Sequence, residues 1–107
     1  MQELAEKLMK RLMKRIWVPF SALIALDQAG NILDICQFDT MFCNIDGLPE
    51  DAAHFLLLTN HPEGYAEPYE EDKENYRRIC AMANGREVCA FICGEDIDCI
   101  GFKVKDT

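Results

Sequence analysis

The sequence predicts an α/β fold in which a mixed β-sheet is flanked by helices. Two helical patterns, over residues 3–17 and 69–83, alternate with short apolar runs that end in turn residues. The chain has 107 residues, which is the usual size of one domain. We therefore expect a single domain over residues 1–107, with an amphipathic N-terminal helix within residues 1–17 and a core over residues 20–104.

The N-terminal helix is predicted from an apolar stripe. The stripe consists of Leu4, Ala5, Leu8, Met9, Leu12, Met13, Ile16 and Trp17, and the charged residues lie opposite. Pro19 ends the helix, because the residue before a proline avoids the helical region. We expect this stripe to be buried against the sheet or against a second copy, which leaves a homodimer open.

The next elements are predicted from short apolar runs. Residues 20–27 and 32–38 flank a turn with Gly30 and Asn31, which is typical of a β-hairpin, and residues 39–49 form a loop or short strand. Pro49 and the two acids after it predict the first turn of a short helix that carries His54. The aliphatic run 55–58 then predicts a buried strand.

The C-terminal part predicts a helix and a second hairpin. The helix over 69–83 starts with acidic residues and ends at Asn84 and Gly85, which favour a C-cap. Strands over residues 88–93 and 99–104 follow, separated by a turn.

Charge and composition limit the classes of partner. The net charge is −8, yet five of the eleven basic residues lie within residues 1–17, so the rest of the chain is strongly acidic. An acidic surface repels phosphate, and we expect no nucleic-acid binding. No apolar run approaches the about 18 residues of a membrane span, so no membrane association is expected either.

The six cysteines favour a reducing compartment. They lie mostly within apolar runs, show no CxxC spacing and follow no recognisable signal peptide. We therefore expect free thiols and a cytoplasmic location.

One stretch carries the spacing of a metal site. His61 ends the predicted strand, and Asp72 lies at the start of the following helix. A turn between them brings both side chains toward one ion, but two protein ligands are one fewer than a catalytic zinc site needs.

This stretch resembles the metal-binding signature of the JAB/MPN metalloprotease family, in its RadC-like branch. That signature reads His-Asn-His-Pro-Ser-Gly, then Pro-Ser, two residues and Asp. The matching positions here are Thr59, Asn60, His61, Pro62, Glu63, Gly64, Pro68, Tyr69 and Asp72. The resemblance covers about residues 20–104 and implies the family's sheet-and-helix arrangement, with a layering similar to that of cytidine deaminases.

The resemblance also shows which catalytic groups are missing. Such enzymes bind zinc through two histidines and the aspartate, use an upstream glutamate as the base, and stabilise the intermediate with a serine. Thr59 replaces the first histidine and Tyr69 the serine, and no glutamate stands near Val18 or Pro19. His61 and Asp72 remain as residual metal ligands. His54 and Cys80 are the weaker candidates to replace the lost histidine.

The acidic stretch that follows His61 is a candidate protein-binding surface. Its expected contact residues are Tyr65, Glu70, Glu71 and Tyr76, because tyrosines beside charges are common at interfaces.

The leading interpretation is a catalytically degenerate RadC-like JAB/MPN domain that acts as a small cytoplasmic protein-binding module without a cofactor. One alternative is a zinc-dependent hydrolase of peptide or isopeptide bonds. Another is an acidic inhibitor protein from a mobile element that occupies the nucleic-acid groove of its target.

Overall fold

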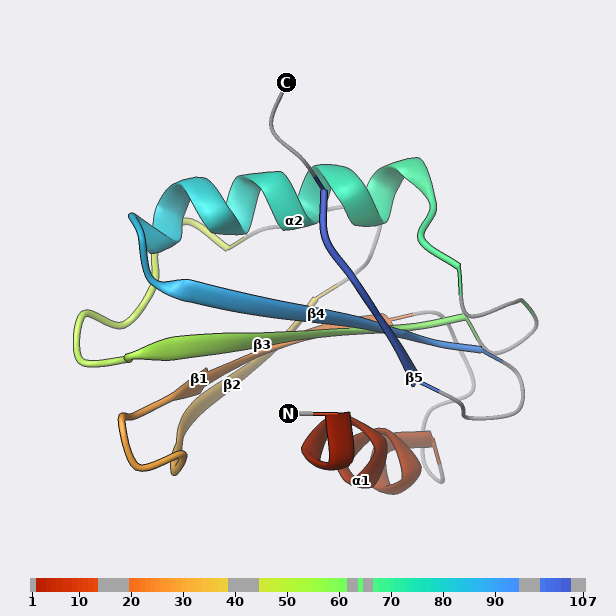
Figure 1. The fold of residues 1–107 in the computed structure, drawn as a ribbon, viewed down its shortest axis with the longest axis horizontal. Coiled ribbons are helices and arrows are strands. Elements are labelled where there is room, and N and C mark those ends of the chain that lie inside the picture. The colour runs from red at the N-terminus through yellow and green to blue at the C-terminus, as the bar shows by residue number, and fades with distance from the viewer. Residues whose placement is uncertain are drawn as a thin grey trace.

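The computed structural model describes residues 2–13, 20–38, 45–61, 64, 67–94 and 99–104. These residues form one five-stranded sheet with a helix on each face (Figure 1). The elements are α1 (Gln2–Met13), β1 (Phe20–Leu26), β2 (Ile32–Phe38), β3 (His54–Asn60), α2 (Glu70–Ala83), β4 (Glu87–Cys93) and β5 (Cys99–Phe102). The predicted α/β class and the sheet flanked by helices are confirmed.

The sheet is mixed, with the strand order β2-β1-β3-β4-β5. β3 and β4 are parallel and are joined through α2, whereas the other neighbouring strands are antiparallel. Phe55 to Thr59 lie in the central strand beside β1, where Phe55 pairs with Ala25 and Thr59 pairs with Ser21. This placement confirms the buried strand and the first hairpin that the sequence predicts.

Side chains alternate between two cores on the two faces of the sheet. The core under α2 includes Leu23, Phe55, Leu57, Tyr76 and Ile79, and the core on the α1 side includes Ala5, Met9, Ile24, Leu56 and Leu58. β3 supplies both cores, because it is central and covered on both faces. Its continuous aliphatic run is therefore the pattern of a strand with no solvent-exposed face.

The burial of α1 corrects part of the predicted stripe. Ala5 and Met9 are fully buried, whereas Leu4 and Leu8 are only partly buried at the border of the core. The apolar stripe is two residues wide. Its Ala5 and Met9 side faces the sheet, and its Leu4 and Leu8 side lies at the border of the core. The predicted helix is confirmed up to Met13, and residues 14–17 lie outside the described residues, as does the side chain of Leu12.

The expected helical turn before His54 is wrong. Residues 49–53 form a turn without a helix, and His54 is the first residue of β3. The backbone amide of Ala53 donates to the Leu26 carbonyl (2.8 Å), so the segment is already aligned with β1. Nη1 of Arg86 donates to the carbonyls of Pro49 (2.7 Å) and Ala52 (3.0 Å), which holds the turn in place.

The C-terminus of α2 agrees with its prediction. Asn84 adopts the left-handed conformation (φ 51°) and Gly85 follows with φ 90°. This is the usual way to end a helix where a glycine is available. Arg86 then donates from Nε to the Ala83 carbonyl (3.0 Å), and its guanidinium lies 4.9 Å from the centre of the Phe55 ring.

One cysteine pair corrects the expectation of free thiols. Cys93 and Cys99 are joined by a disulfide across the β4–β5 hairpin, where they are direct cross-strand partners with Cα atoms 4.3 Å apart. The strand register brings the two thiols together, and spacing along the sequence does not show this. Cys36, Cys80 and Cys89 are not in a disulfide, and burial together with the neighbouring Glu87 raises the pKa of the Cys89 thiol.

Within the described ranges, no helix is both long and apolar enough to cross a bilayer.

The β1–β2 hairpin is closed by the carboxylate of Asp27. This group accepts the amides of Ala29 (2.9 Å) and Asn31 (2.8 Å) and the Nδ2 group of Asn31 (3.1 Å). The Asn31 backbone bond is the main cause that lowers the pKa of Asp27, followed by the bond from the Asn31 side chain. The carboxylate therefore stabilises the turn in its charged form.

We expect Asp27→Asn to lower the melting temperature near neutral pH but much less in acid. Because the folded pKa is lowered, the contribution of Asp27 is complete above the ordinary aspartate pKa of about 3.9 and is lost as the pH falls through the folded value. Melting curves of both proteins between about pH 6 and about pH 3 measure the difference. Asp51→Asn, at an exposed position in the 49–53 turn, is the control. A gap between Asp27→Asn and the unmodified protein that stays constant with pH would contradict the assignment.

Candidate functional site

The two residual metal ligands are in direct contact. Nε2 of His61 lies 2.9 Å from Oδ2 of Asp72, and both side chains are buried. His61 follows the last residue of β3, and Asp72 lies in the first turn of α2. The structure therefore joins two residues that are eleven positions apart in the sequence.

Backbone contacts fix both partners. The amide of His61 donates to the carbonyl of Cys93 (2.9 Å), which extends the parallel pairing of β3 with β4 by one residue. Asp72 is the third helical residue of α2, and its Oδ2 accepts the backbone amide of the N-cap residue Tyr69 (2.7 Å). This second bond is one half of a capping box and satisfies an amide at the start of the helix.

Tyr69 covers the pair from the solvent side. Its ring centre lies 4.1 Å from that of His61, and its side chain remains 45% exposed. Gly64 makes this arrangement possible, because a Cβ at that position would lie 2.7 Å from the Tyr69 hydroxyl. The amide of Gly64 also donates to the His61 carbonyl (3.1 Å), so the chain turns sharply after the strand.

Thr59 lies on the same face of β3 as His61, since side chains two residues apart in a strand share a face. Its hydroxyl is buried and lies 3.0 Å from the hydroxyl of Ser21 on β1. Asn60, between Thr59 and His61, is also buried and faces the α1 side. The resemblance places the first histidine at position 59. The hydroxyl of Thr59 occupies this position and is hydrogen-bonded to that of Ser21.

Ser21 belongs to this polar cluster and was missed by the sequence prediction. It is a lone hydroxyl in the otherwise apolar strand Phe20–Leu26, and it is fully buried. A polar residue within such a run is a usable signal, because buried hydroxyls need a partner. Its partner depends on the β1–β3 register, which pairs Ser21 with Thr59.

Only one of the two carboxylate oxygens of Asp72 accepts hydrogen bonds from described residues. Its Oδ1 is buried and has no hydrogen-bond partner among the described residues, whereas Oδ2 accepts two bonds. Such an atom is costly to bury. It marks the point of the site that is best suited to accept a further donor or a cation.

Within the part of the chain that the structure describes, the donor groups around His61 and Asp72 do not fit a catalytic zinc site. Among the described residues, no third histidine, cysteine, aspartate or glutamate joins His61 and Asp72. The Thr59 hydroxyl is a weak zinc ligand compared with imidazole. In addition, Nε2 of His61 is already engaged with Asp72.

Neither substitute for the missing histidine is suited to this role. His54 lies on β3 rather than on the expected helix, and as the first residue of that strand it is roughly 20 Å from His61. Cys80 packs partly against the core under α2, more than two turns after Asp72.

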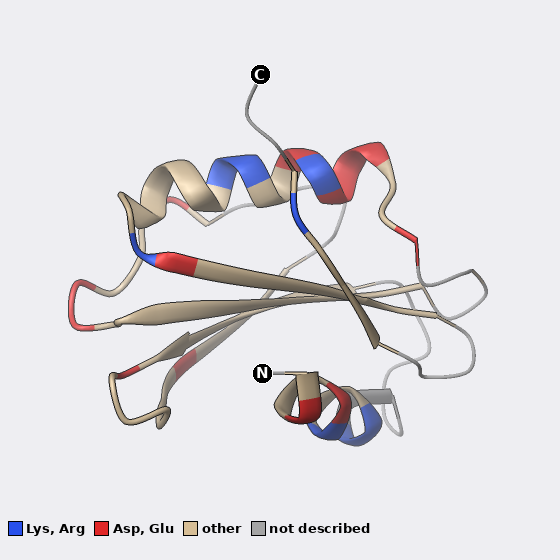
Figure 2. Cartoon of the chain, viewed as in Figure 1, with Lys and Arg blue, Asp and Glu red and all other residues tan. Residues whose placement is uncertain are grey.

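The residues of the predicted binding surface differ in exposure. Glu70 is exposed and Glu71 half-buried at the start of α2, where acidic residues gather (Figure 2). Tyr76 is wrong as a surface anchor: it is buried in the core, and its ring centre lies 5.6 Å from that of Phe102. Helix periodicity explains the difference, because Tyr76 lies four residues after Asp72 and shares its inward face.

Pro68 is half-buried directly before the N-cap residue Tyr69. Pro62 and Tyr65 lie outside the described residues.

Comparison with known proteins adds no assignment: neither the protein-family models nor the curated proteins contain a match to this chain.

Proposed function

We propose that this chain is a catalytically degenerate domain of the RadC-like JAB/MPN type that acts as a protein-binding module. The observation that carries the proposal is the 2.9 Å contact between His61 Nε2 and Asp72 Oδ2. It joins the two signature residues that remain in this sequence, with Nε2 of His61 and Oδ2 of Asp72 as hydrogen-bond partners. The pair thereby serves as a structural tie between β3 and α2.

The placement of the signature residues supports the family part of the proposal. Thr59 and His61 follow one another on the same face at the end of a central strand, and Asp72 lies in the first turn of the next helix. This is the arrangement that a strand–turn–helix metal site requires. Under this proposal, Thr59 stands where the first histidine of the ligand set would lie.

The chemistry of the replacements supports the loss of activity. A catalytic zinc site takes three protein ligands and keeps one position for water. Proton abstraction by a positioned base contributes about 100-fold or more to such reactions. The positions where the resemblance places the base, Val18 and Pro19, hold no acid–base group.

Zinc binding tests this proposal. We expect the unmodified protein to bind well under one equivalent of zinc in calorimetric titration and to cleave no peptide or isopeptide substrate. Thr59→His should raise the zinc affinity, because it places a second imidazole on the face that holds His61. It should give little turnover, because no base is restored.

Ala25→His is the matched control. Ala25 is equally buried on the same face of the sheet, but it pairs with Phe55 at the other end of β3 from His61. It should therefore not reproduce the gain in zinc affinity. Tight stoichiometric zinc in the unmodified protein that is lost in His61→Ala would overturn the degenerate assignment.

A zinc-dependent peptide or isopeptide hydrolase is the second candidate. The unsatisfied buried Oδ1 of Asp72 favours it, because a carboxylate oxygen of this kind is a ready ligand for a cation. Hydrolysis that requires both His61 and Asp72 would select this candidate.

A cytoplasmic location is also part of the proposal. The reduced state of Cys36, Cys80 and Cys89, none of which is in a disulfide, supports it. The Cys93–Cys99 disulfide opposes it, because disulfides are rare in reducing compartments. Both cysteines are buried, which shields the bond from soluble reductants.

A further inference from the structure

The edge strand β2 exposes an unusual amount of apolar surface. Ile32, Leu33 and Ile35 are 44%, 41% and 51% exposed, and every residue from Ile32 to Gln37 is exposed. Of the residues of β2, only Phe38 belongs to a core, the one under α2. The rest of β2 therefore lies outside both cores, and the strand carries neither the lysine nor the proline that usually protects a sheet edge.

A hydrogen bond shows which amides of β2 face outward. The amide of Ile35 donates to Oδ1 of Asp34 (2.9 Å), a side chain of its own strand, which indicates an amide that points away from β1. Amides alternate in direction along an antiparallel strand, so that of Gln37 also faces the open edge. If a strand were added at this edge, one of its backbone carbonyls would accept the bond from the Ile35 amide in place of the Asp34 carboxylate.

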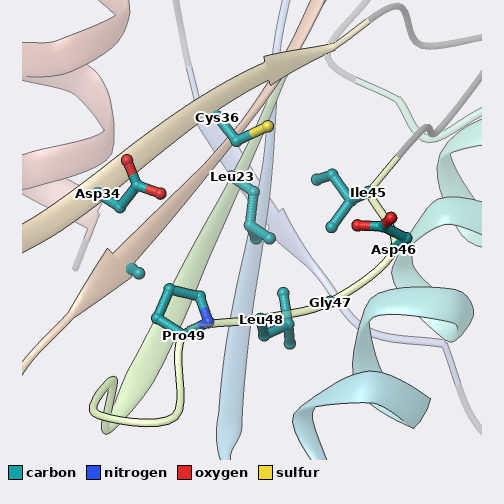
Figure 3. Close-up of a pocket in the computed structure, with 9 residues that line it drawn as sticks. Leu23, Asp34, Cys36, Ile45, Asp46, Gly47, Leu48 and Pro49 are labelled. Atoms are coloured by element: carbon teal, nitrogen blue, oxygen red, sulfur yellow. The ribbon is translucent and has the colours of Figure 1, made fainter.

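A groove lies beside this edge on the α2 side of the sheet (Figure 3). It has a volume of about 200 Å³ and is bounded by β1, β2 and residues 45–49. Leu23, Ile45 and Leu48 supply its apolar walls, and the carboxylates of Asp34 and Asp46 stand at opposite sides of it. The groove therefore matches a side chain with an apolar stem and a positive end.

We propose that β2 is a docking edge for an extended segment of a partner protein with alternating basic and apolar side chains. The inference rests on the proposed protein-binding function and names its surface. The backbone of the segment pairs with β2, and its carbonyl displaces the Asp34 carboxylate from the Ile35 amide. Its lysine or arginine side chains enter the groove, and its apolar side chains cover Ile35 on the opposite face, because successive side chains alternate.

Charge favours such a segment over a second copy of this chain. An antiparallel pair of β2 strands centred on Ile35 would place both Asp34 carboxylates on one face as diagonal neighbours, about 7–8 Å apart. Each chain also carries a net charge of −8, so two copies repel each other. A basic segment instead brings positive charge to the carboxylates of Asp34 and Asp46 in the groove.

Two synthetic peptides test the proposal with the full chain. Both have eight residues and blocked ends, and valine alternates with lysine in one and with glutamate in the other. We expect the lysine peptide to shift backbone NMR signals of residues 32–38 and 45–49, and the glutamate peptide to bind at least tenfold more weakly. Asp46→Asn should weaken the lysine peptide about two- to fivefold, as expected for one exposed charge pair.

Backbone pairing is tested from both sides. Ile35→Pro removes the outward amide, and a lysine peptide N-methylated at alternate residues removes the partner's donors without altering the protein. Both should abolish binding. Ile35→Ser should weaken it, whereas Ile100→Ser, at an equally exposed isoleucine on the opposite edge strand β5, should not.

Several outcomes would overturn the proposal. Equal binding of the two peptides, or shifts confined to the acidic start of α2, would place recognition elsewhere. Dimerisation that Ile35→Pro abolishes, without peptide binding, would make the second copy the occupant. The zinc titrations depend on His61 and Asp72, so the degenerate assignment succeeds or fails independently of these results.

Discussion

Asp72→Ala is expected to lower the free energy of unfolding by about 3 kcal/mol, since it combines the loss of a helix cap with an unpaired buried group. The substitution removes the acceptor of the Tyr69 amide and leaves Nε2 of His61 buried without its partner. Urea denaturation followed by circular dichroism measures the change. The start of α2 should also exchange its amide hydrogens faster.

Asp72→Asn and Glu71→Ala are the controls for this variant. Asn keeps the shape and an acceptor oxygen, so it should recover part of the loss. Glu71 is the half-buried neighbour in the same helical turn, and its replacement should change the stability far less. If His61→Ala and the double variant show the two effects to be additive, the pair is not coupled and the structural-tie assignment fails.

Phe55→Ala is expected to lower the free energy of unfolding by about 3–5 kcal/mol. The ring is fully buried in the core under α2, with the Arg86 guanidinium over one face. Its removal leaves a cavity at the start of β3, next to the turn that Arg86 holds. Because folded domains are stable by only about 5–15 kcal/mol, this variant should be close to unfolded at moderate temperature.

Phe55→Leu separates the cavity from other effects. It keeps most of the apolar volume and should cost clearly less than the alanine variant. Ile100→Ala, which truncates an exposed apolar side chain in β5, should lie within about 0.5 kcal/mol of the unmodified protein. A loss below about 1 kcal/mol in Phe55→Ala would show that the core under α2 closes around the missing ring.

Local patterns in the sequence were sufficient to predict most of the fold. The aliphatic run 55–58, the turn at Gly30 and the acidic start of the helix over 69–83 each predicted an element that the structure contains. These signals are local, because they depend on the period of apolar residues and on residues that favour turns or helix ends. The turn before His54 was mispredicted because its conformation depends on Arg86, more than thirty residues away.

For the candidate site, the sequence predicted some of the residues but not the contacts between them. The spacing of His61 and Asp72 marked the two residues, but their direct contact depends on the strand–turn–helix path between them. Ser21, the burial of Tyr76 and the Cys93–Cys99 bond follow from strand register and helix packing. No period in the sequence encodes these relations.

The sequence by itself determined the α/β class and the order of the strands and helices, apart from the helical turn that it predicted before His54. The tertiary structure alone decided that β2 lies at an open edge with a groove beside it, and that His61 and Asp72 are in hydrogen-bond contact. Secondary structure responds to neighbours a few residues away, whereas edges, grooves and buried pairs arise where distant segments meet.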